Sequence, residues 1–363
     1  MDFKTIFFNC GFLLCLALNV QGQKISLPKH YVCYKAASSL KIDGKADEKS
    51  WQMADWTDDF VDITGNQQSP PRFRTRTKML WDTKYFYVFA EIYEPHIWAN
   101  LRQRDTVIYL NNDFEVFIDP DGDTHKYFEF EVNALNTQWD LLLTKPYRDG
   151  GIPITTWNFD KMISAVSIDG TINNPSDTDR MWGVEIAFPL KSLGDSSAVV
   201  PVRQGDQWRV NFSRVEWQAS VQNGQYFKKV NPKTGKRLPE DNWVWSPQGS
   251  VNMHIPDKWG YVQFSDIICG KGTAAFISNL EDEVKDELRI LYYSQKRHHI
   301  SYQRYASAIT DLDGMDDYKS SELKFNPEIK LTSGGYEVTA KQTASDKIWH
   351  INESGKVWAE KNH

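Results

Sequence analysis

Apolar and polar residues alternate most clearly over residues 113–133, a pattern that predicts two strands joined by a turn. The apolar positions are Phe114, Val116 and Ile118 on the first strand and Phe128, Phe130 and Val132 on the second. Successive side chains of a strand point to opposite faces, so these six residues predict a core face. The acidic segment 119–123 contains a proline and a glycine and predicts the turn.

The opposite face of this hairpin carries carboxylates. If the turn centres on residues 121–122, Glu115 lies opposite Glu129 or Glu131. Like charges that oppose each other across a ladder are unfavourable. Either water screens this face, or a cation or a hydroxyl-rich ligand binds there, and the pattern leaves these alternatives open.

Further alternating segments predict a mainly β protein. They cover residues 75–81, 85–94, 138–144, 161–168, 180–189, 207–217 and 259–264. Strands at this spacing, with few helices between them, predict an antiparallel β-sandwich of the immunoglobulin or jelly-roll type over residues 23–269. The hairpin 75–94 is aromatic on both faces, which predicts a central position in its sheet.

The pattern changes from Gly270 onward. Leu280, Val284, Leu288 and Leu291 follow helical spacing and predict an amphipathic helix of about six turns. Short strand patterns follow at 323–331, 336–341 and 348–351. We therefore expect residues 270–363 to form a small α+β unit that folds separately and offers a surface to a protein partner.

Residues 1–22 have the features of a signal peptide. An apolar run over residues 12–20 follows one lysine, and Gly22 provides a small residue for cleavage before Gln23. The run is too short to span a bilayer permanently, and two leucines precede Cys15 where lipid attachment favours a small residue. The sequence predicts an exported periplasmic or extracellular protein without stable membrane insertion.

Removal of this segment leaves two cysteines, Cys33 and Cys269. In an oxidising compartment such a pair predicts a disulfide, here one that joins the two ends of the sandwich. The alternative is two unpaired buried thiols.

Composition narrows the range of ligands. The net charge is −6 over 363 residues, with no long basic run, which argues against a nucleic-acid partner. Aromatic residues make up 13% of the chain, including 14 tryptophans, although the mean hydropathy is −0.55. Some rings should therefore lie near the surface, where they can stack on sugars, and the others belong to the core.

One acidic segment has spacing suited to a metal. Asp119, Asp121 and Asp123 alternate around a glycine and could direct hard oxygen ligands at structural calcium. An ordinary hairpin turn is the alternative. The histidines show no zinc-type spacing.

Three segments, 42–51, 80–88 and 113–119 with 130–133, together resemble carbohydrate-binding module family 9. The resemblance extends over residues 36–265. It implies a β-sandwich that binds sugars, commonly with structural calcium, as an accessory to polysaccharide breakdown. The family's sugar-bonding glutamate matches Glu115, one clamp tryptophan matches Tyr109, the second clamp position falls near Met253, and the sugar-bonding arginine is Glu131 here.

These observations predict a non-catalytic module that binds carbohydrate and serves carbohydrate catabolism, with a saccharide as its ligand. The predicted contacts are Tyr109, Glu115, Glu131 and Asn133, with Trp98, Trp139 and Trp217 as additional rings. One alternative is a hydrolase of O-glycosyl bonds that uses the carboxylate pair on the hairpin. Another is a structural or assembly protein built on a degenerate sugar-binding scaffold.

Overall fold

The computed structural model describes residues 28–194, 201–314, 319–342 and 346–361. The predicted signal peptide and its cleavage site lie outside these residues. The strands before residue 270 are β1 (His30–Lys35), β2 (Val61–Asp62), β3 (Thr75–Trp81), β4 (Tyr85–Tyr93), β5 (Asp113–Asp119), β6 (Tyr127–Asn133), β7 (Gln138–Leu143), β8 (Pro153–Ile154), β9 (Ile163–Asp169), β10 (Met181–Pro189), β11 (Gln207–Glu216), β12 (Ala219–Gln222), β13 (Gln225–Lys228), β14 (Asp241–Val244) and β15 (Gly260–Ile268). The short helical segments among them are α1 (Lys49–Met53), α2 (Leu190–Leu193), η1 (Ile108–Leu110), η2 (Tyr147–Asp149) and η4 (Pro256–Lys258).

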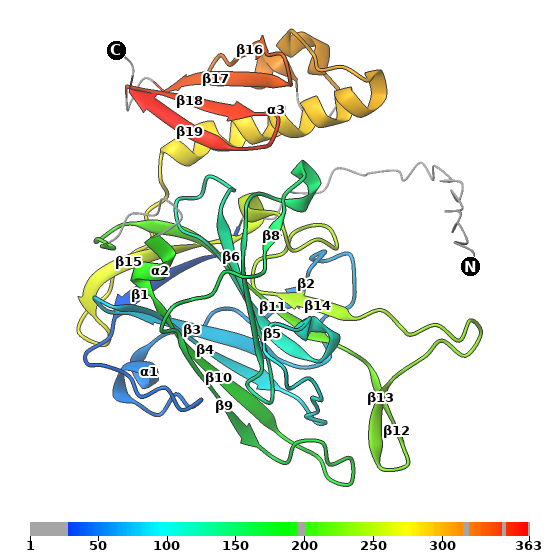
Figure 1. The fold of residues 1–363 in the computed structure, drawn as a ribbon. Helices are drawn as coiled ribbons and strands as arrows, with labels where there is room; N and C mark the ends of the chain where they lie inside the picture. The colour runs from blue at the N-terminus through cyan, green and yellow to red at the C-terminus, as the bar shows by residue number, and fades with distance from the viewer. Residues whose placement is uncertain (1–27, 195–200, 315–318, 343–345, 362–363) are drawn as a thin grey trace, which may run out of the picture.

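Most of these strands belong to one long sheet that folds over on itself (Figure 1). Its order is β8-β7-β6-β5-β11-β15-β1-β3-β4-β10-β9, and β14 pairs with both β11 and β2. The rings of Phe130 on β6 and Phe188 on β10 lie 5.7 Å apart, although their strands are distant in this order. The two halves of the sheet therefore pack face to face as a β-sandwich, which confirms the predicted fold class. The pairing is antiparallel except at β1, which runs parallel to β15 and β3.

The core between the two halves has the composition that the alternation predicts. Phe114, Val116 and Ile118 of β5 are buried there, and so are Phe86, Val88 and Ala90 of β4. The hairpin β3–β4 is central, since β1 and β10 flank it. Each buried large apolar side chain contributes about 1.5–3 kcal/mol, so this core supplies most of the stability of the sandwich.

The predicted disulfide is not formed. Cys33 and Cys269 are both buried free thiols. Cys33 packs into the core between the two halves, whereas Cys269 packs into a separate cluster with Trp51 and Leu80. Burial raises the pKa of both thiols, so neither is activated as a thiolate. The sequence spacing identified two cysteines near the sandwich ends but not the clusters into which they point.

The C-terminal unit contains the predicted helix and strands. They are α3 (Glu281–Tyr302), β16 (Glu328–Leu331), β17 (Tyr336–Gln342), β18 (Lys347–Asn352) and β19 (Val357–Lys361), and the four strands form one antiparallel sheet. Leu288 and Leu291 of α3 pack on Val338 and other buried residues as a core of their own. Among the described residues, no helix is both long and apolar enough to cross a membrane. The domain boundary at residue 270 stays a prediction.

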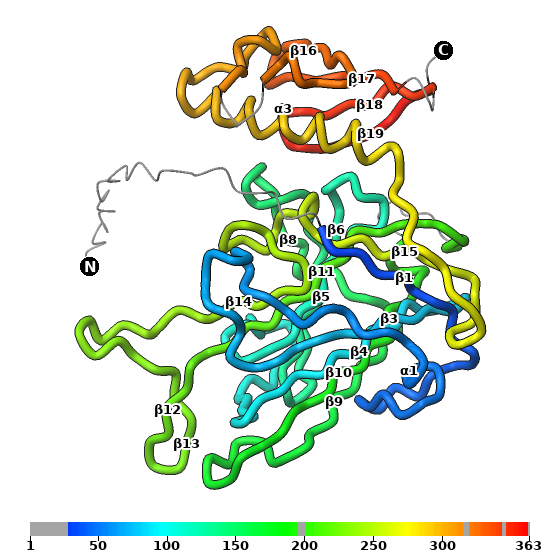
Figure 2. Tube along the Cα trace, turned by 180° about the vertical axis from the view of Figure 1, so that it is seen from behind, coloured from blue at the N-terminus to red at the C-terminus, as the bar shows by residue number. Residues whose placement is uncertain are grey.

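The C-terminal unit sits at one end of the sandwich (Figure 2) and contacts it through buried polar groups. Asp149 of η2 accepts hydrogen bonds from the Tyr292 hydroxyl at 2.7 and 2.9 Å and pairs with Lys296 at 2.6 Å. Arg148 donates to the Tyr292 hydroxyl at 3.1 Å and to Asp257 at 3.0 Å. Asp257 also accepts from the Tyr293 hydroxyl at 2.8 Å. The two units are therefore joined by a charged network rather than by the linker alone.

Asp257 makes the stability of this interface depend on pH in the acidic range. Burial alone would raise its pKa, but the charges of Arg148, Arg289 and Lys258, with the Tyr293 hydrogen bond, outweigh burial and lower it to about 2. The contribution of Asp257 to the free energy of unfolding is complete at pH values above 3.8, the ordinary pKa of an aspartate. It is lost as the pH falls toward 2, the pKa in the folded protein, which is a change of about 2 kcal/mol. We expect wild type to lose more unfolding free energy between pH 4 and pH 2 than Asp257→Asn, measured by urea unfolding. Parallel losses in both proteins would contradict this role.

Candidate functional site

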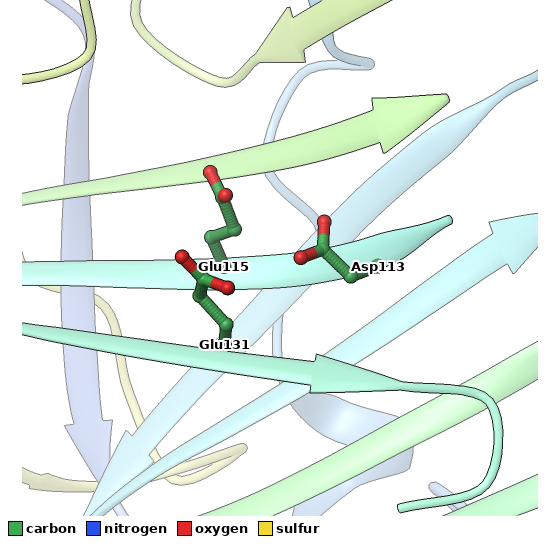
Figure 3. A group of neighbouring side chains, drawn as sticks. All are labelled: Asp113, Glu115 and Glu131. Carbon is green, nitrogen blue, oxygen red and sulfur yellow. The ribbon is translucent and has the colours of Figure 1, made fainter. Parts of the chain in front are cut away.

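The outer face of β5 and β6 carries a group of acidic side chains. In the ladder, Glu115 stands directly opposite Glu131, and Phe117 stands opposite Glu129. Asp113 lies two residues before Glu115 on the same face. Figure 3 shows that Asp113, Glu115 and Glu131 project to the same side of the two strands, with their carboxylates turned toward one shared space. The sequence pattern thus identified the correct face, and the structure selects Glu131 as the partner of Glu115.

Loops surround this face and leave a pocket of about 270 Å³. Its floor is Glu115, Phe117, Glu129 and Glu131, and its walls are Ile63, Tyr109, Val215, Glu240, Asn242 and the segment 251–254. Tyr109 comes from η1, whose backbone N–H donates to Glu131 at 2.9 Å. The strands therefore hold the acidic floor rigidly, while the loops set the shape of the opening.

The four carboxylates of this face are strongly perturbed. Burial raises the pKa of Glu115 to about 7, and the nearby Ser213 opposes that shift. For Asp113, Glu129 and Glu131, burial and then the charge of Glu115 raise the pKa well above its usual range. Clustered carboxylates with shifted pKa values are typical of binding or catalytic sites.

Basic side chains near this group are few. Lys228 lowers the pKa of Asp113, but its ammonium lies 3.2 Å from the centre of the Trp217 ring. Burial lowers the pKa of Lys228 itself to about 8. None of the salt bridges among the described residues involves Asp113, Glu115 or Glu131. The described basic side chains therefore do not neutralise these three carboxyl groups by ion pairing.

His254 forms one wall of the pocket in its neutral form. Burial and the charge of Arg148 lower its pKa to about 4. Its Nδ1 lies 2.9 Å from the Tyr127 hydroxyl, and its carbonyl oxygen accepts a hydrogen bond from Arg148 at 3.4 Å. Because Arg148 also bonds to Tyr292 of α3, the wall is connected to the C-terminal unit.

Two partly exposed tyrosine rings flank the acidic floor. Tyr109 is 40% exposed and Tyr147 is 45% exposed. The Tyr147 ring stacks edge to face on His254, with 4.5 Å between ring centres. Partial burial, followed by the charges of Glu129 and Glu131, raises the pKa of Tyr147 to about 12. Exposed rings beside polar groups provide surfaces on which a sugar ring can stack.

The predicted site residues divide into two groups. Tyr109, Glu115 and Glu131 line the pocket, whereas Asn133, Trp98, Trp139 and Trp217 do not line it. Asn133 is fully buried and its side chain bonds to the backbone of Leu101, Leu135 and Thr137, so it shapes the turn after β6.

The three tryptophans have packing roles. Trp217 donates to the Tyr109 carbonyl at 2.8 Å and so positions η1. Trp98 packs beside Trp217, and Trp139 packs against the cluster that contains Phe117. Met253, near the second clamp position, lines the pocket as the resemblance implies.

Sequence reasoning missed several residues of the site. Asp113 has the same parity as Glu115, so alternation alone could have placed it on this face. Tyr147 begins the short segment η2, and His254 and Glu240 lie on loops; these segments have no periodic pattern, so the sequence had no comparable signal for them.

The acidic turn has a different structure from the pocket. Oxygens of Asp119, Asp121 and Asp123 lie within 4.8 Å of one another. Both oxygens of Asp119 accept backbone hydrogen bonds, from Gly122 at 3.0 Å and Thr124 at 2.9 Å. Asp123 pairs with Lys356 of the C-terminal unit at 3.4 Å. These contacts are those of a turn that also docks the C-terminal unit, and calcium binding here stays a prediction.

The fold and the pocket define a β-sandwich binding module, and comparison with known proteins identifies its class. Residues 42–198 match the family described as carbohydrate family 9 binding domain-like. The chain therefore contains a carbohydrate-binding module family 9 domain, and this domain includes Tyr109, Asp113, Glu115, Glu129 and Glu131.

Individual relatives are similar only in part. The chain is 36% identical over 81 residues to endo-1,4-beta-xylanase C of Paenibacillus barcinonensis, which is 22% of this chain and 6% of that protein. It is 28% identical over 99 residues to exoglucanase XynX of Acetivibrio thermocellus, which is 27% of this chain and 8% of that protein. A family 9 module from Caldicellulosiruptor kristjanssonii, solved with cellotriose, aligns with 68% of this chain and 99% of its own at 14% identity and a TM-score of 0.42.

Proposed function

We propose that this chain is an exported, non-catalytic module that binds a saccharide in the pocket on the outer face of β5 and β6. The observation that carries the proposal is the combination, within one pocket, of the acidic floor and the exposed ring of Tyr109. Carboxylates accept hydrogen bonds from sugar hydroxyls, and tyrosine rings stack on the apolar faces of sugars. The match of residues 42–198 to a carbohydrate-binding family supports this proposal.

The pocket of about 270 Å³ suits one or two sugar rings. Glu115 and Glu131 supply acceptors at the floor, and neutral His254 adds a polar group on one wall. Tyr109 provides a stacking surface in the pocket, and the exposed Tyr147 ring, which packs on the wall residue His254, provides a second one beside it. Tyr147 thereby takes the role of a second ring, which the resemblance placed near Met253. An accessory role beside polysaccharide-degrading enzymes follows as part of the same proposal.

A glycan array probed with the purified mature chain tests this function. We expect retention on a small set of related glycans, with binding that competes with the free oligosaccharide. No retention on any glycan would contradict the proposal. Assays of reducing-sugar release on the same glycans separate binding from hydrolysis, since the alternative of a carboxylate-pair hydrolase requires turnover.

We also propose a structural calcium ion at the acidic turn. The proposal is supported by three carboxylates whose oxygens approach within 4.8 Å and by the partial exposure of Asp121 and Asp123. Asp121→Asn should then lower the gain in melting temperature that calcium gives, measured by scanning calorimetry with and without chelator. An identical calcium response in the variant would contradict this site.

A further inference from the structure

Asp113 is a fully buried carboxylate of the sandwich, and within the described part of the chain it has no partner for either oxygen. It is 0% exposed, and neither of its carboxylate oxygens has a hydrogen-bond partner among the described residues. The backbone N–H of Val215 lowers the pKa of Asp113, but it does not form a hydrogen bond of normal geometry with either oxygen. By contrast, Glu185 accepts hydrogen bonds from Trp51, Asp43 and Gly44. A buried polar group without a partner is costly, which points to a ligand that the described residues do not supply.

The oxygens of Asp113 face those of two further carboxylates. Asp113, Glu115 and Glu131 each place one oxygen within 4.8 Å of the others (Figure 3). One oxygen of Glu131 accepts a hydrogen bond from the Tyr109 N–H. Lys228, the lysine that lowers the pKa of Asp113, places its ammonium over the Trp217 ring and not on these carboxylates. Three converging carboxylates therefore lack a compensating positive charge from the described side chains.

We propose that Asp113, Glu115 and Glu131 bind one calcium ion at the floor of the pocket. Hydroxyl oxygens of the bound sugar then occupy coordination positions of this ion that the three carboxylates leave open. Calcium takes six to eight oxygen ligands in flexible geometry, and three carboxylates leave positions for water or hydroxyl oxygens. Magnesium demands a stricter octahedron and keeps its own water, and the absence of histidine and cysteine from the group disfavours zinc.

The proposed ion is separate from the one at the acidic turn. Asp113 begins β5 and Asp119 ends it, and a rise of about 3.3 Å per residue puts them about 20 Å apart. The two sites can therefore be distinguished by mutation. The calcium site itself is independent of the saccharide, whereas its contribution to sugar binding rests on the proposed function.

Calorimetric titration of the chelated full chain with calcium tests the site. We expect Asp113→Asn to bind one calcium ion fewer than wild type, or to bind it at least tenfold more weakly. In chelator, Asp113→Asn should melt at the same temperature as wild type or higher, because the substitution removes one of three carboxyl groups crowded within 4.8 Å of one another. With calcium present, wild type should melt at a higher temperature than Asp113→Asn. The melting temperature of wild type should rise by roughly 5 °C when the free calcium concentration is about a hundredfold above the dissociation constant.

Two controls isolate the effect. Asp58→Asn removes an exposed carboxylate that pairs with Lys29, so its calcium titration should equal that of wild type. Asp121→Asn changes the acidic turn and should retain the pocket site. Equal calcium binding in wild type and Asp113→Asn, without a reversal of melting order, would overturn the proposal.

Sugar titrations with and without calcium separate this inference from the proposed function. Calcium binding that depends on Asp113, without binding of any saccharide, would leave the metal site standing and refute the sugar proposal. Sugar affinity unaffected by chelator would refute the role of the ion in sugar binding. The protein in chelator could instead bind an amino sugar tightly, with no change when calcium is added. This result would show that the carboxylates bind the ammonium group of the sugar, and it would overturn the metal site.

Discussion

Glu115→Gln is expected to weaken saccharide binding more than tenfold and to leave the sandwich folded. Glu115 lies on the floor of the pocket, directly opposite Glu131, where its oxygens can accept hydrogen bonds from sugar hydroxyls. Bonds to a charged acceptor contribute about 1.5–3 kcal/mol, and the neutral amide retains only part of this. Calorimetric titration with a glycan selected on the array measures the loss.

Glu91→Gln provides a matched control for this change. Glu91 lies on β4 outside the pocket and pairs with Arg74 and Arg76. Its amide variant should bind the glycan as wild type does. If Glu115→Gln also binds every array ligand as tightly as wild type, while both variants melt as folded proteins, Glu115 is a structural residue and the site assignment is wrong.

Arg148→Ala is expected to destabilise the full chain by about 3–5 kcal/mol. The side chain of Arg148 is 19% exposed and that of its partner Asp257 is 4% exposed. Removal of Arg148 breaks this buried ion pair and leaves only Arg289, Lys258 and the Tyr293 hydroxyl to compensate Asp257, which costs far more than the loss of a surface ion pair. Urea unfolding followed by tryptophan fluorescence measures the change.

An exposed ion pair in the same sandwich serves as the comparison. Arg180 and Asp169 pair with side chains that are 62% and 53% exposed. Arg180→Ala should change the free energy of unfolding by no more than about 1 kcal/mol. Equal effects of the two substitutions would show that the Arg148 network does not hold the C-terminal unit against the sandwich.

The Arg148 network also connects the C-terminal unit to the pocket. Arg148 bonds to the Tyr292 hydroxyl on α3 and to the carbonyl of His254, a pocket residue. Loss of the network should therefore loosen the wall that carries His254 as well as the interface. The sandwich therefore contacts α3 through this network, and the separate folding of residues 270–363 and their external protein partner stay predictions.

Strand alternation allowed much of the sandwich to be predicted from the sequence. Phe114 and Val116 have one parity and Glu115 the other, so the core face and the acidic face of β5 followed from the period of two. The helical spacing of Leu288 and Leu291 likewise identified α3. These features are local, because each depends on residues that are close together in the chain.

Long-range packing accounts for what the sequence did not reveal. The parallel placement of β1 between β15 and β3 brings together segments more than two hundred residues apart, and no local pattern encodes it. The separate burial of Cys33 and Cys269 and the placement of Tyr147 beside the carboxylates have the same origin. Parity shows which side chains share a face, but not which loop covers that face.

A crystal structure of the full chain with an array-selected oligosaccharide, grown with calcium, tests the central claim most directly. We predict a sugar ring within hydrogen-bonding distance of Glu115, stacked on Tyr109 in the pocket beside β5 and β6. A saccharide bound elsewhere, for example beside the projecting hairpin β12–β13 (Figure 1), with the acidic pocket free of sugar, would contradict it.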